Sequence, residues 1–339
     1  MGGREAWVRV LVTGGGGFLG FAVARQLRAR GDQVRSLARG SYPELAEHGI
    51  EEVRADLADA QGVSDAVAGC DAVIHTAAKA GDFGPYAEYH AANVEGTANV
   101  LAACREHGVD RLVHTSTPSV VHGGGDVEGV DESAPYPDHF DAAYPETKAI
   151  AERMVLEANG PDLATVALRP HLIWGPGDHH LVPKIISRAR AGRLRRIGNE
   201  PRLIDVVYID NAADAHLLAL DRLTPGSACA GKAYFISQGE PVPNWEMIDR
   251  ILAAGGEPPC TRTISAGMAS FAGGVLELAF RVLPLGDEPP MTRFAAHQLS
   301  TAHWYDISAA RRDLGFEPRV SIDEGLERLA AHLREFPVD

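Results

Sequence analysis

A tyrosine and a lysine stand four residues apart in the segment AAYPETKAIAE, at Tyr144 and Lys148. On a helix this spacing places both side chains on one face. Reduction of a carbonyl group needs an acid that protonates the developing alkoxide, and an isolated tyrosine, with a pKa of about 10, is poorly matched to neutral pH. A neighbouring ammonium group favours the tyrosinate and lowers that pKa. We therefore predict a proton-transfer pair, with an ordinary surface pair as the alternative; Tyr136 is no candidate, because its i+4 residue is Phe140.

Hydroxyl side chains gather in the segment TSTPSVV, which starts at Thr115 and follows the apolar stretch RLVH. In doubly wound α/β folds, ligands bind at the carboxyl ends of the strands. A hydroxyl group at the end of this stretch can therefore hydrogen-bond a substrate carbonyl beside Tyr144. Capping of a turn is the alternative role for these side chains.

Glycines recur in the segment VRVLVTGGGGFLG, between a predicted strand and a predicted helix. Glycine permits a tight turn and close approach of a pyrophosphate, while the helix N-terminus presents unpaired N–H groups to it. We predict a dinucleotide-binding loop, with a ligand-free glycine turn as the alternative. The predicted cofactor contacts of this loop are Thr13, Gly14, Gly17, Phe18, Leu19 and Gly20.

The second predicted strand should carry the residue that reads the cofactor ribose. An acidic residue there binds the 2′-hydroxyl of NAD, whereas an arginine accommodates the 2′-phosphate of NADP. The segment QVRSLARGS has Arg39 and no Asp or Glu at this position. Because a guanidinium group binds phosphate with charge-assisted hydrogen bonds, we predict NADPH rather than NADH, with a simple surface arginine as the alternative.

Short apolar runs alternate with helical spacing through the first half of the chain. Strands are predicted at 8–12, 33–37, 50–54, 72–75, 111–115 and 164–168, and helices at 19–30, 86–107 and 142–158. Such alternation requires crossover connections and so predicts an α/β fold, a Rossmann-type doubly wound parallel sheet. Beyond residue 170, Pro and Gly become more frequent. We expect a dinucleotide-binding domain at 6–170, with later segments returning to its sheet, and a smaller C-terminal substrate-binding lobe at 171–335.

Composition excludes several classes of function. The 339 residues include 32 Lys+Arg against 46 Asp+Glu, and the net charge of -14 argues against nucleic-acid binding. The four cysteines are widely spaced and form no CxxC motif, so we predict no metal site, no disulfide framework and a reducing cytoplasmic location. We expect no signal peptide and no transmembrane segment. The apolar stretch 266–285 contains Glu277 and Arg281, so we predict a packed amphipathic helix, with peripheral membrane contact as the alternative.

The spacing Gly-x-x-Gly-x-x-Gly after a threonine, together with Tyr-x-x-x-Lys, resembles the extended branch of the short-chain dehydrogenase/reductase superfamily. The resemblance implies that Lys148 also binds the nicotinamide ribose. It aligns Thr117 with the catalytic hydroxyl residue, leaving Ser116 as the alternative, and Asn93 with an asparagine that supports a proton relay. It implies further cofactor contacts by Asp56 and Leu57 near the adenine and by Ala77, Ala78 and Lys79 near the nicotinamide ribose. It also implies a homodimer that is formed through the helices at 86–107 and 142–158.

Within that branch, TSTPSVV, YPETKAIAE and HWYDISAARRDLGFEP resemble the 3β-hydroxysteroid dehydrogenase-like group. More narrowly, GGGGFLG, NVEGTANVL, TVALRPHLIWGPGDHHLVP and ACAGKAYFIS are similar to the bacterial 2-alkyl-3-oxoalkanoate reductases of long-chain olefin and β-lactone biosynthesis. That similarity implies reduction, with NADPH, of the ketone of a 2-alkyl-3-oxoalkanoic acid that carries long apolar chains. It implies an apolar pocket, for which the candidates are Met268, Phe271, Leu276 and Phe280, unless these only pack a helix. Candidates for binding the carboxylate are Lys79, His122, His171 and Arg188.

Three other functions stay open. A sterol or steroid 3β-hydroxy dehydrogenase would share the catalytic residues and differ in the shape of its pocket. An NAD-dependent sugar-nucleotide epimerase or dehydratase would need a diphosphate clamp, for which Arg193, Arg195 and Arg196 are candidates, although Pro118 stands where a dehydratase carries an acidic residue. A noncatalytic NADP-sensing regulator commonly lacks the tyrosine or the lysine, and this chain has both.

Overall fold

A parallel sheet of seven strands forms the centre of the computed structural model, which describes residues 8–283 and 288–338. Its strand order is β12-β7-β5-β4-β1-β2-β3, and every neighbouring pair is parallel. The predicted Rossmann-type doubly wound sheet is thereby confirmed. The strands of this sheet are β1 (Arg9–Thr13), β2 (Gln33–Ala38), β3 (Glu51–Arg54), β4 (Ala72–His75), β5 (Arg111–Thr115), β7 (Ala164–Pro170) and β12 (Lys232–Ile236).

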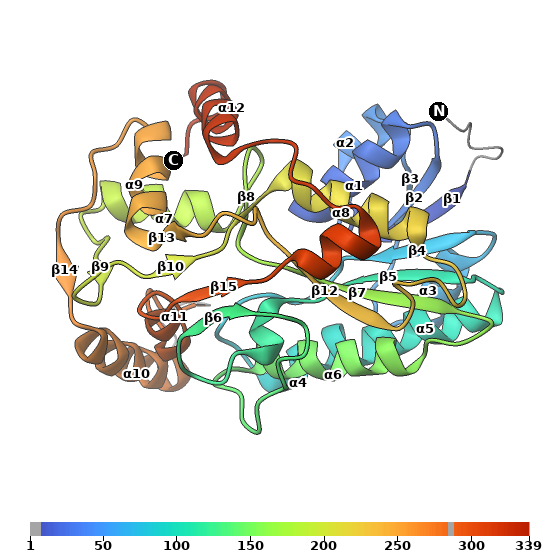
Figure 1. Cartoon of the computed structure of the whole chain (residues 1–339), viewed down its shortest axis with the longest axis horizontal. Coiled ribbons are helices and arrows are strands. Elements are labelled where there is room, and N and C mark those ends of the chain that lie inside the picture. The colour runs from blue at the N-terminus through green and yellow to red at the C-terminus, as the bar shows by residue number, and fades with distance from the viewer. Residues whose placement is uncertain (1–7, 284–287, 339) are drawn as a thin grey trace.

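Helices cover both faces of this sheet (Figure 1). Alternate residues of β1 explain the two layers, because Val10 and Val12 belong to the core beneath one face and Leu11 to the core beneath the other. One face carries α1 (Phe18–Ala29), α2 (Pro43–Glu47) and α8 (Ile209–Arg222). The opposite face carries α3 (Ala60–Val67), α4 (Tyr86–Tyr89), α5 (Gly96–Glu106) and α6 (Ala143–Glu157).

The helix predicted at 86–107 is interrupted. It starts as α4, passes through a π-helical turn at His90–Glu95 and continues as α5. The π turn carries Asn93, which is buried and whose side chain donates hydrogen bonds to the Lys79 carbonyl at 3.1 Å and to Thr147 Oγ1 at 3.0 Å. Its Oδ1 accepts the Lys79 backbone N–H at 2.7 Å. Such π turns are often found at functional sites, where one extra residue redirects a side chain.

A smaller sheet with the order β13-β10-β15-β6 lies beyond the carboxyl ends of the large sheet. Strand β6, from the first half of the chain, pairs with β15, from the second half. Strand β12, also from the second half, joins the large sheet beside β7. The two halves are therefore interleaved. The small sheet consists of β6 (Val127–Val130), β10 (Leu203–Ile204), β13 (Val242–Pro243) and β15 (His303–Tyr305). Two further strand pairs are β8 (Ile173–Trp174) with β11 (Val207–Tyr208) and β9 (Arg196–Ile197) with β14 (Thr263–Ile264).

Helices of the second half surround the small sheet, at the left and top in Figure 1. They are α7 (Leu181–Arg190), α9 (Asn244–Ala254), α10 (Ala266–Val282), α11 (Arg293–Gln298) and α12 (Ile322–Glu335). A short 3-10 turn follows β5 at Pro118–Val121, and a second π turn lies at Ala310–Leu314.

One face of α10 is apolar and exposed. Its exposed residues recur at spacings of three and four, which places them on one side of the helix. They are Met268, Phe271, Val275, Leu278 and Val282. The other side packs against α11, and a side chain at Gly273 would meet the backbone carbonyl carbon of Thr292 at 2.7 Å. Among the described residues, no helix is both long and apolar enough to cross a membrane, and the last part of the predicted stretch 266–285 lies outside those residues.

Candidate active site

A cavity of about 980 Å³ opens beyond the carboxyl ends of the central strands. The strand order reverses here: from β1 the chain first adds β2 and β3 on one side and then β4 and β5 on the other. Ligands of doubly wound sheets bind at such a point. The glycine loop and the ends of β2 and β3 line one half of the cavity, which we call the cofactor half. Residues that follow β7, together with α11 and β15, line the other half, which we call the substrate half. The ends of β5 and α6 lie where the halves meet.

The glycine loop has the shape that a dinucleotide phosphate requires. Gly14 has φ of +73° and approaches the segment after β4 so closely that a side chain there would lie 3.0 Å from the Ala77 backbone. At Gly20 a side chain would lie 2.1 Å from the Gly14 carbonyl oxygen, so the first turn of α1 also needs glycine. Within the described chain no side chain caps the N-terminus of α1, which leaves its N–H groups available to an anion. The loop therefore fits the phosphates of a dinucleotide.

The structure brings the predicted cofactor residues together around this half, with one exception. Thr13 lies beneath the loop, where its Oγ1 accepts the Ala77 backbone N–H at 3.2 Å and contacts His75 Nδ1 at 2.7 Å. It positions the end of β4 and is not among the residues that line the cavity. The predicted residues that do line it are Gly14, Gly17, Phe18, Leu19, Gly20, Arg39, Asp56, Leu57, Ala77, Ala78 and Lys79.

Arg39 follows β2 at the rim of the cofactor half. Its side chain is 81% exposed, and its Nη1 lies 3.9 Å from the Asp56 carboxylate. The neighbouring Tyr42 packs over the loop, because a side chain at Gly16 would lie 2.2 Å from the Tyr42 ring. A guanidinium group in this position can turn toward a phosphate without leaving a buried partner behind. Sequence reasoning did not identify Tyr42.

Tyr144, Lys148 and Thr117 all line the cavity where the two halves join. Lys148 Nζ donates a hydrogen bond to the Thr115 carbonyl at 2.6 Å and lies 3.2 Å from His114 Nε2. Burial lowers the pKa of Lys148 to about 8, although Glu152 opposes the change. The predicted lowering of the Tyr144 pKa by Lys148 is wrong for this structure, because burial raises the pKa of the phenol and the opposing contribution comes from a hydrogen bond with Thr117.

Thr117 is also positioned by its neighbour. Its Oγ1 lies 2.7 Å from Ser119 Oγ and accepts the Ser119 backbone N–H at 3.3 Å. The alternative residue, Ser116, is buried beside the Glu152 carboxylate and contributes to lowering the pKa of Glu152. Thr117, which hydrogen-bonds Tyr144, is therefore better placed than Ser116 to act on a substrate.

A buried ion pair supports α6 beneath the catalytic residues. The Glu152 carboxylate accepts hydrogen bonds from Arg169 Nη2 at 2.6 Å and Nε at 3.0 Å, and from the Tyr136 hydroxyl at 2.6 Å. Sequence reasoning missed Glu152, although its position four residues after Lys148 places it on the same helix face. The side chain of Asn93, by contrast, hydrogen-bonds Lys79 and Thr147, and within the described chain it makes no hydrogen bond to Lys148.

The predicted apolar lining of the substrate half is wrong. Met268 and Phe271 are 59% and 72% exposed, and Phe280 packs against Phe83 with ring centroids 6.4 Å apart. The reason is that α10 packs on α11, and α11 instead supplies the cavity wall. The apolar residues that line this half are Leu172, Ile173, Ile204, Phe294, Ala295 and Leu299.

Two of the four candidates for binding a carboxylate line the cavity. Lys79 does so, and its Nζ is paired with Glu88 at 2.8 Å. His171 lines the substrate half, and its Nε2 lies 2.7 Å from His303 Nδ1. Among the described residues that line the cavity, His122 and Arg188 do not appear.

Known proteins resemble this chain over nearly its whole length. The model of the 3-beta hydroxysteroid dehydrogenase/isomerase family matches residues 11–261. A 2-alkyl-3-oxoalkanoate reductase of Stenotrophomonas maltophilia is 56% identical over 326 residues, which cover 96% of this chain and 99% of the relative. A 3 beta-hydroxysteroid dehydrogenase/Delta 5-->4-isomerase of Mycobacterium tuberculosis is 37% identical over 328 residues, covering 94% of this chain and 88% of the relative.

A solved structure shares the fold. The UDP-glucose 4-epimerase of Thermus thermophilus, in complex with NAD, superposes with a TM-score of 0.73. Its sequence is 25% identical, and the match covers 96% of this chain and 99% of the epimerase.

Proposed function

The chain belongs to the 3-beta hydroxysteroid dehydrogenase/isomerase family and is an oxidoreductase, and we propose that it reduces the ketone of a 2-alkyl-3-oxoalkanoic acid to a 2-alkyl-3-hydroxyalkanoic acid with NADPH. The observation that carries the reaction type is that Thr117, Tyr144 and Lys148 lie at the junction of the two halves of one cavity. The substrate class is supported by the 56% identity to a 2-alkyl-3-oxoalkanoate reductase.

Tyr144, Thr117 and Lys148 each have a separate role in the proposed reduction. When bound, the reduced nicotinamide supplies the hydride that the ketone carbon accepts. Tyr144 gives its phenolic proton to the ketone oxygen, so that hydride and proton together form the alcohol. Thr117 donates a hydrogen bond that orients the same oxygen, and the Lys148 ammonium stabilises the tyrosinate that remains. Positioning of the carbonyl within the cavity supplies much of the rate.

Four groups of residues would hold the cofactor. The glycine loop and the N-terminus of α1 would bind its diphosphate, and Asp56 and Leu57 would contact the adenine. Lys148 would bind the nicotinamide ribose. Arg39 supports NADPH over NADH, since it is exposed and follows β2 in a segment, SLARGS, that contains no Asp or Glu; its acidic neighbour, Asp56, belongs to the segment after β3.

A steroid 3β-hydroxy dehydrogenase is the second candidate. It is supported by the family match and by the 37% identity to the mycobacterial enzyme. Such an enzyme would use the same three catalytic residues on a neutral polycyclic alcohol, so only the choice of substrate separates the two functions.

Two substrates distinguish the candidates. The purified protein would be incubated with a 2-alkyl-3-hydroxyalkanoic acid or with a 3β-hydroxysteroid, and the formation of reduced nicotinamide followed with NADP and with NAD. The reverse direction avoids β-keto acids, which decarboxylate. We expect turnover of the hydroxy acid, reduced at least about 100-fold in Tyr144→Phe. Tyr86→Phe, at an exposed tyrosine on α4, is the matched control. Turnover of the steroid alone would replace the proposal with the second candidate.

We also propose a cytoplasmic location. The four cysteines are buried and unpaired, which suits a reducing compartment.

A further inference from the structure

Cationic side chains are unevenly distributed in the cavity. Among the lining residues that the structure describes, arginine and lysine occur only as Arg39, Lys79 and Lys148. Arg39 lies at the far rim of the cofactor half, Lys79 is paired with Glu88, and Lys148 is hydrogen-bonded to the Thr115 carbonyl. A substrate carboxylate in the substrate half must therefore find a different partner.

Histidine is the remaining side chain there that can carry a positive charge, and three histidines of the described chain line the cavity. His180 is exposed beside the Asp178 carboxylate, which disfavours an anion. His171 and His303 are 8% and 3% exposed and lie against each other. We infer that His171, held by His303, binds the carboxylate of the substrate; this inference rests on the proposed function.

Position supports His171. In the large sheet Thr115 of β5 pairs with Leu168 of β7, and parallel neighbours lie about 4.8 Å apart. Thr117 follows Thr115 by two residues, and His171 follows Leu168 by three. In a 3-oxo acid one carbon separates the ketone from the carboxyl group, so the side chains that bind the two groups must lie close to each other. Thr117 after β5 and His171 after β7 follow the ends of neighbouring strands and meet this requirement.

Hydrogen bonds fix the protonation of the pair. His303 Nε2 lies 2.7 Å from the Gln298 carbonyl oxygen, which can only accept, so His303 carries its proton on Nε2. The Nδ1 of neutral His303 is then an acceptor for the Nε2–H of His171 at 2.7 Å. The Nδ1 of neutral His171 therefore carries a lone pair, and no hydrogen bond from within the described chain occupies it. Protonation of this single atom creates an imidazolium that donates to a carboxylate.

The groups around His171 make protonation of its Nδ1 depend on binding of the substrate carboxylate. Burial, followed by His303 and His122, holds the pKa of His171 well below its usual value. The groups around His171 are His303 and Tyr305 on β15 and His122 after the 3-10 turn, and they supply no negative charge. A carboxylate supplies the missing charge, so anion and proton bind together.

The test compares an acid with its ester. Wild type, His171→Gln and His180→Gln would be assayed with NADP on 2-butyl-3-hydroxyoctanoic acid and on its methyl ester. The glutamine amide can still donate to His303 but has no atom that titrates. We expect His171→Gln to lower kcat/KM for the acid about 10- to 100-fold and for the ester less than about 3-fold. His180, an exposed histidine that lines the same cavity, is the matched control, and we expect its variant to leave the acid-to-ester ratio unchanged.

Calorimetry on the wild-type protein provides a readout that does not depend on a variant. Binding of the hydroxy acid, measured near pH 7.5 in two buffers of different ionisation enthalpy, should take up close to one proton, and binding of the ester none. Equal losses on acid and ester in His171→Gln, or no proton uptake with the acid, would overturn this inference alone. Wild-type protein that oxidises a steroid and does not bind the acid would overturn both this inference and the proposed substrate.

Discussion

Lys148 is the residue in which activity and stability conflict most directly. Its side chain is buried, and burial lowers its pKa from 10.5 to about 8. At neutral pH the ammonium is nevertheless charged, which is the form that stabilises a tyrosinate. The Thr115 carbonyl and His114 compensate part of the lost hydration. The folded protein therefore keeps a charge in a place that opposes folding.

Lys148→Met should abolish turnover and raise stability. The pKa difference corresponds to roughly 3 kcal/mol of free energy that opposes folding. The variant no longer has this penalty, but it loses the hydrogen bonds of Lys148, which offsets part of the gain. We therefore expect Tm to rise by roughly 2–4 °C. The gain should be full below pH 8, where lysine is charged in both states, and should fade toward pH 10.5. Calorimetric melting at several pH values measures it. Lys184→Met, at an exposed lysine paired with Glu288, is the control; a Lys148 variant that melts lower at pH 7 would contradict the prediction.

Arg39 is the residue on which cofactor choice depends. Replacing it by alanine removes the charge proposed to bind the 2′-phosphate and leaves the hydroxyl-bearing ribose of NAD unaffected. We expect KM for NADP to rise about 10- to 100-fold and KM for NAD to change little. Arg54→Ala, at the exposed end of the neighbouring strand β3, is the control. Equal changes for NADP and NAD would remove the basis for preferring NADPH.

At the scale of elements, the site depends on strand ends that are far apart in sequence. Strand β15 lies between β6 and β10, and His303 pairs with Val127 on one side and with Ile204 on the other. Asp205, which follows β10, accepts the Tyr305 backbone N–H at 2.8 Å and so holds the end of β15. Burial raises the pKa of Asp205 to about 6.

Asp205→Asn should stabilise the protein in a pH-dependent way. The folded-state pKa of about 6 lies above the usual 3.8, so the ionised carboxylate opposes folding above pH 6 and has no such effect below pH 4. An asparagine oxygen can still accept the Tyr305 N–H. We therefore expect a gain of about 1–3 kcal/mol at pH 7 and almost none at pH 4, measured by chemical denaturation. Asp126→Asn, an exposed carboxylate that accepts the Ala302 N–H, should change stability little at both pH values. A gain of equal size at pH 4 and pH 7 would refute the burial argument.

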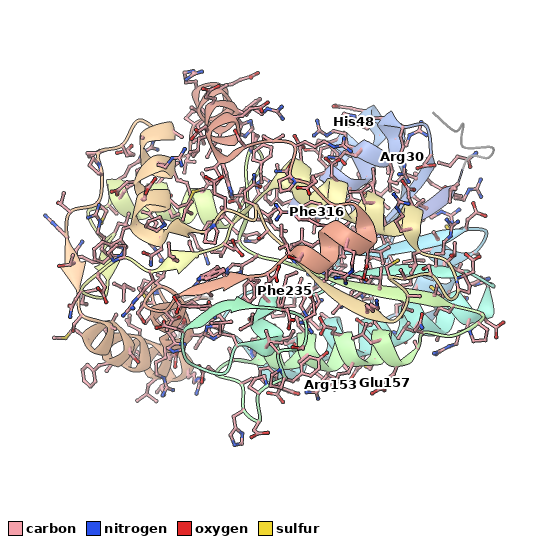
Figure 2. All side chains as sticks on the ribbon, viewed as in Figure 1. Arg30, His48, Arg153, Glu157, Phe235 and Phe316 are labelled. Atoms are coloured by element: carbon pink, nitrogen blue, oxygen red, sulfur yellow. The ribbon has the colours of Figure 1, made fainter. Side chains whose placement is uncertain are left out.

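At the scale of the whole molecule, two surfaces are suited to contact another chain. The outer faces of α5 and α6 form the first, and Figure 2 shows Arg153 and Glu157 on the outer side of α6. The exposed stripe of α10 is the second. The resemblance to extended short-chain dehydrogenases/reductases implies that the first surface is the one that forms a dimer.

We propose a homodimer of twice the 36.2 kDa chain, formed through α5 and α6. Ile150→Arg, at a partly exposed residue of α6, should place charges in this interface and yield monomers at micromolar concentration. Phe271→Arg on α10 should leave the dimer intact. Sedimentation velocity distinguishes these outcomes, and dissociation by Phe271→Arg alone would assign the interface to α10 instead.

The sequence by itself determined the features that depend on local spacing. The glycine loop, the strands with their crossover helices and the i, i+4 relation of Tyr144 and Lys148 follow from residues that are close in the chain. The family resemblance added Thr117, which the structure places beside Tyr144. Helical periodicity did not reveal the π turn that carries Asn93, because the contacts of its side chain lie on other elements.

Only the tertiary structure decided which distant residues meet. His171 and His303 are 132 residues apart, and no pattern in either segment indicates their contact. The apolar residues of α10 had the composition of a pocket wall, yet their stripe faces outward, because periodicity identifies an apolar face and not what covers it. Side chains that are distant in sequence are brought together by the packing of sheets and helices, which depends on the whole chain at once.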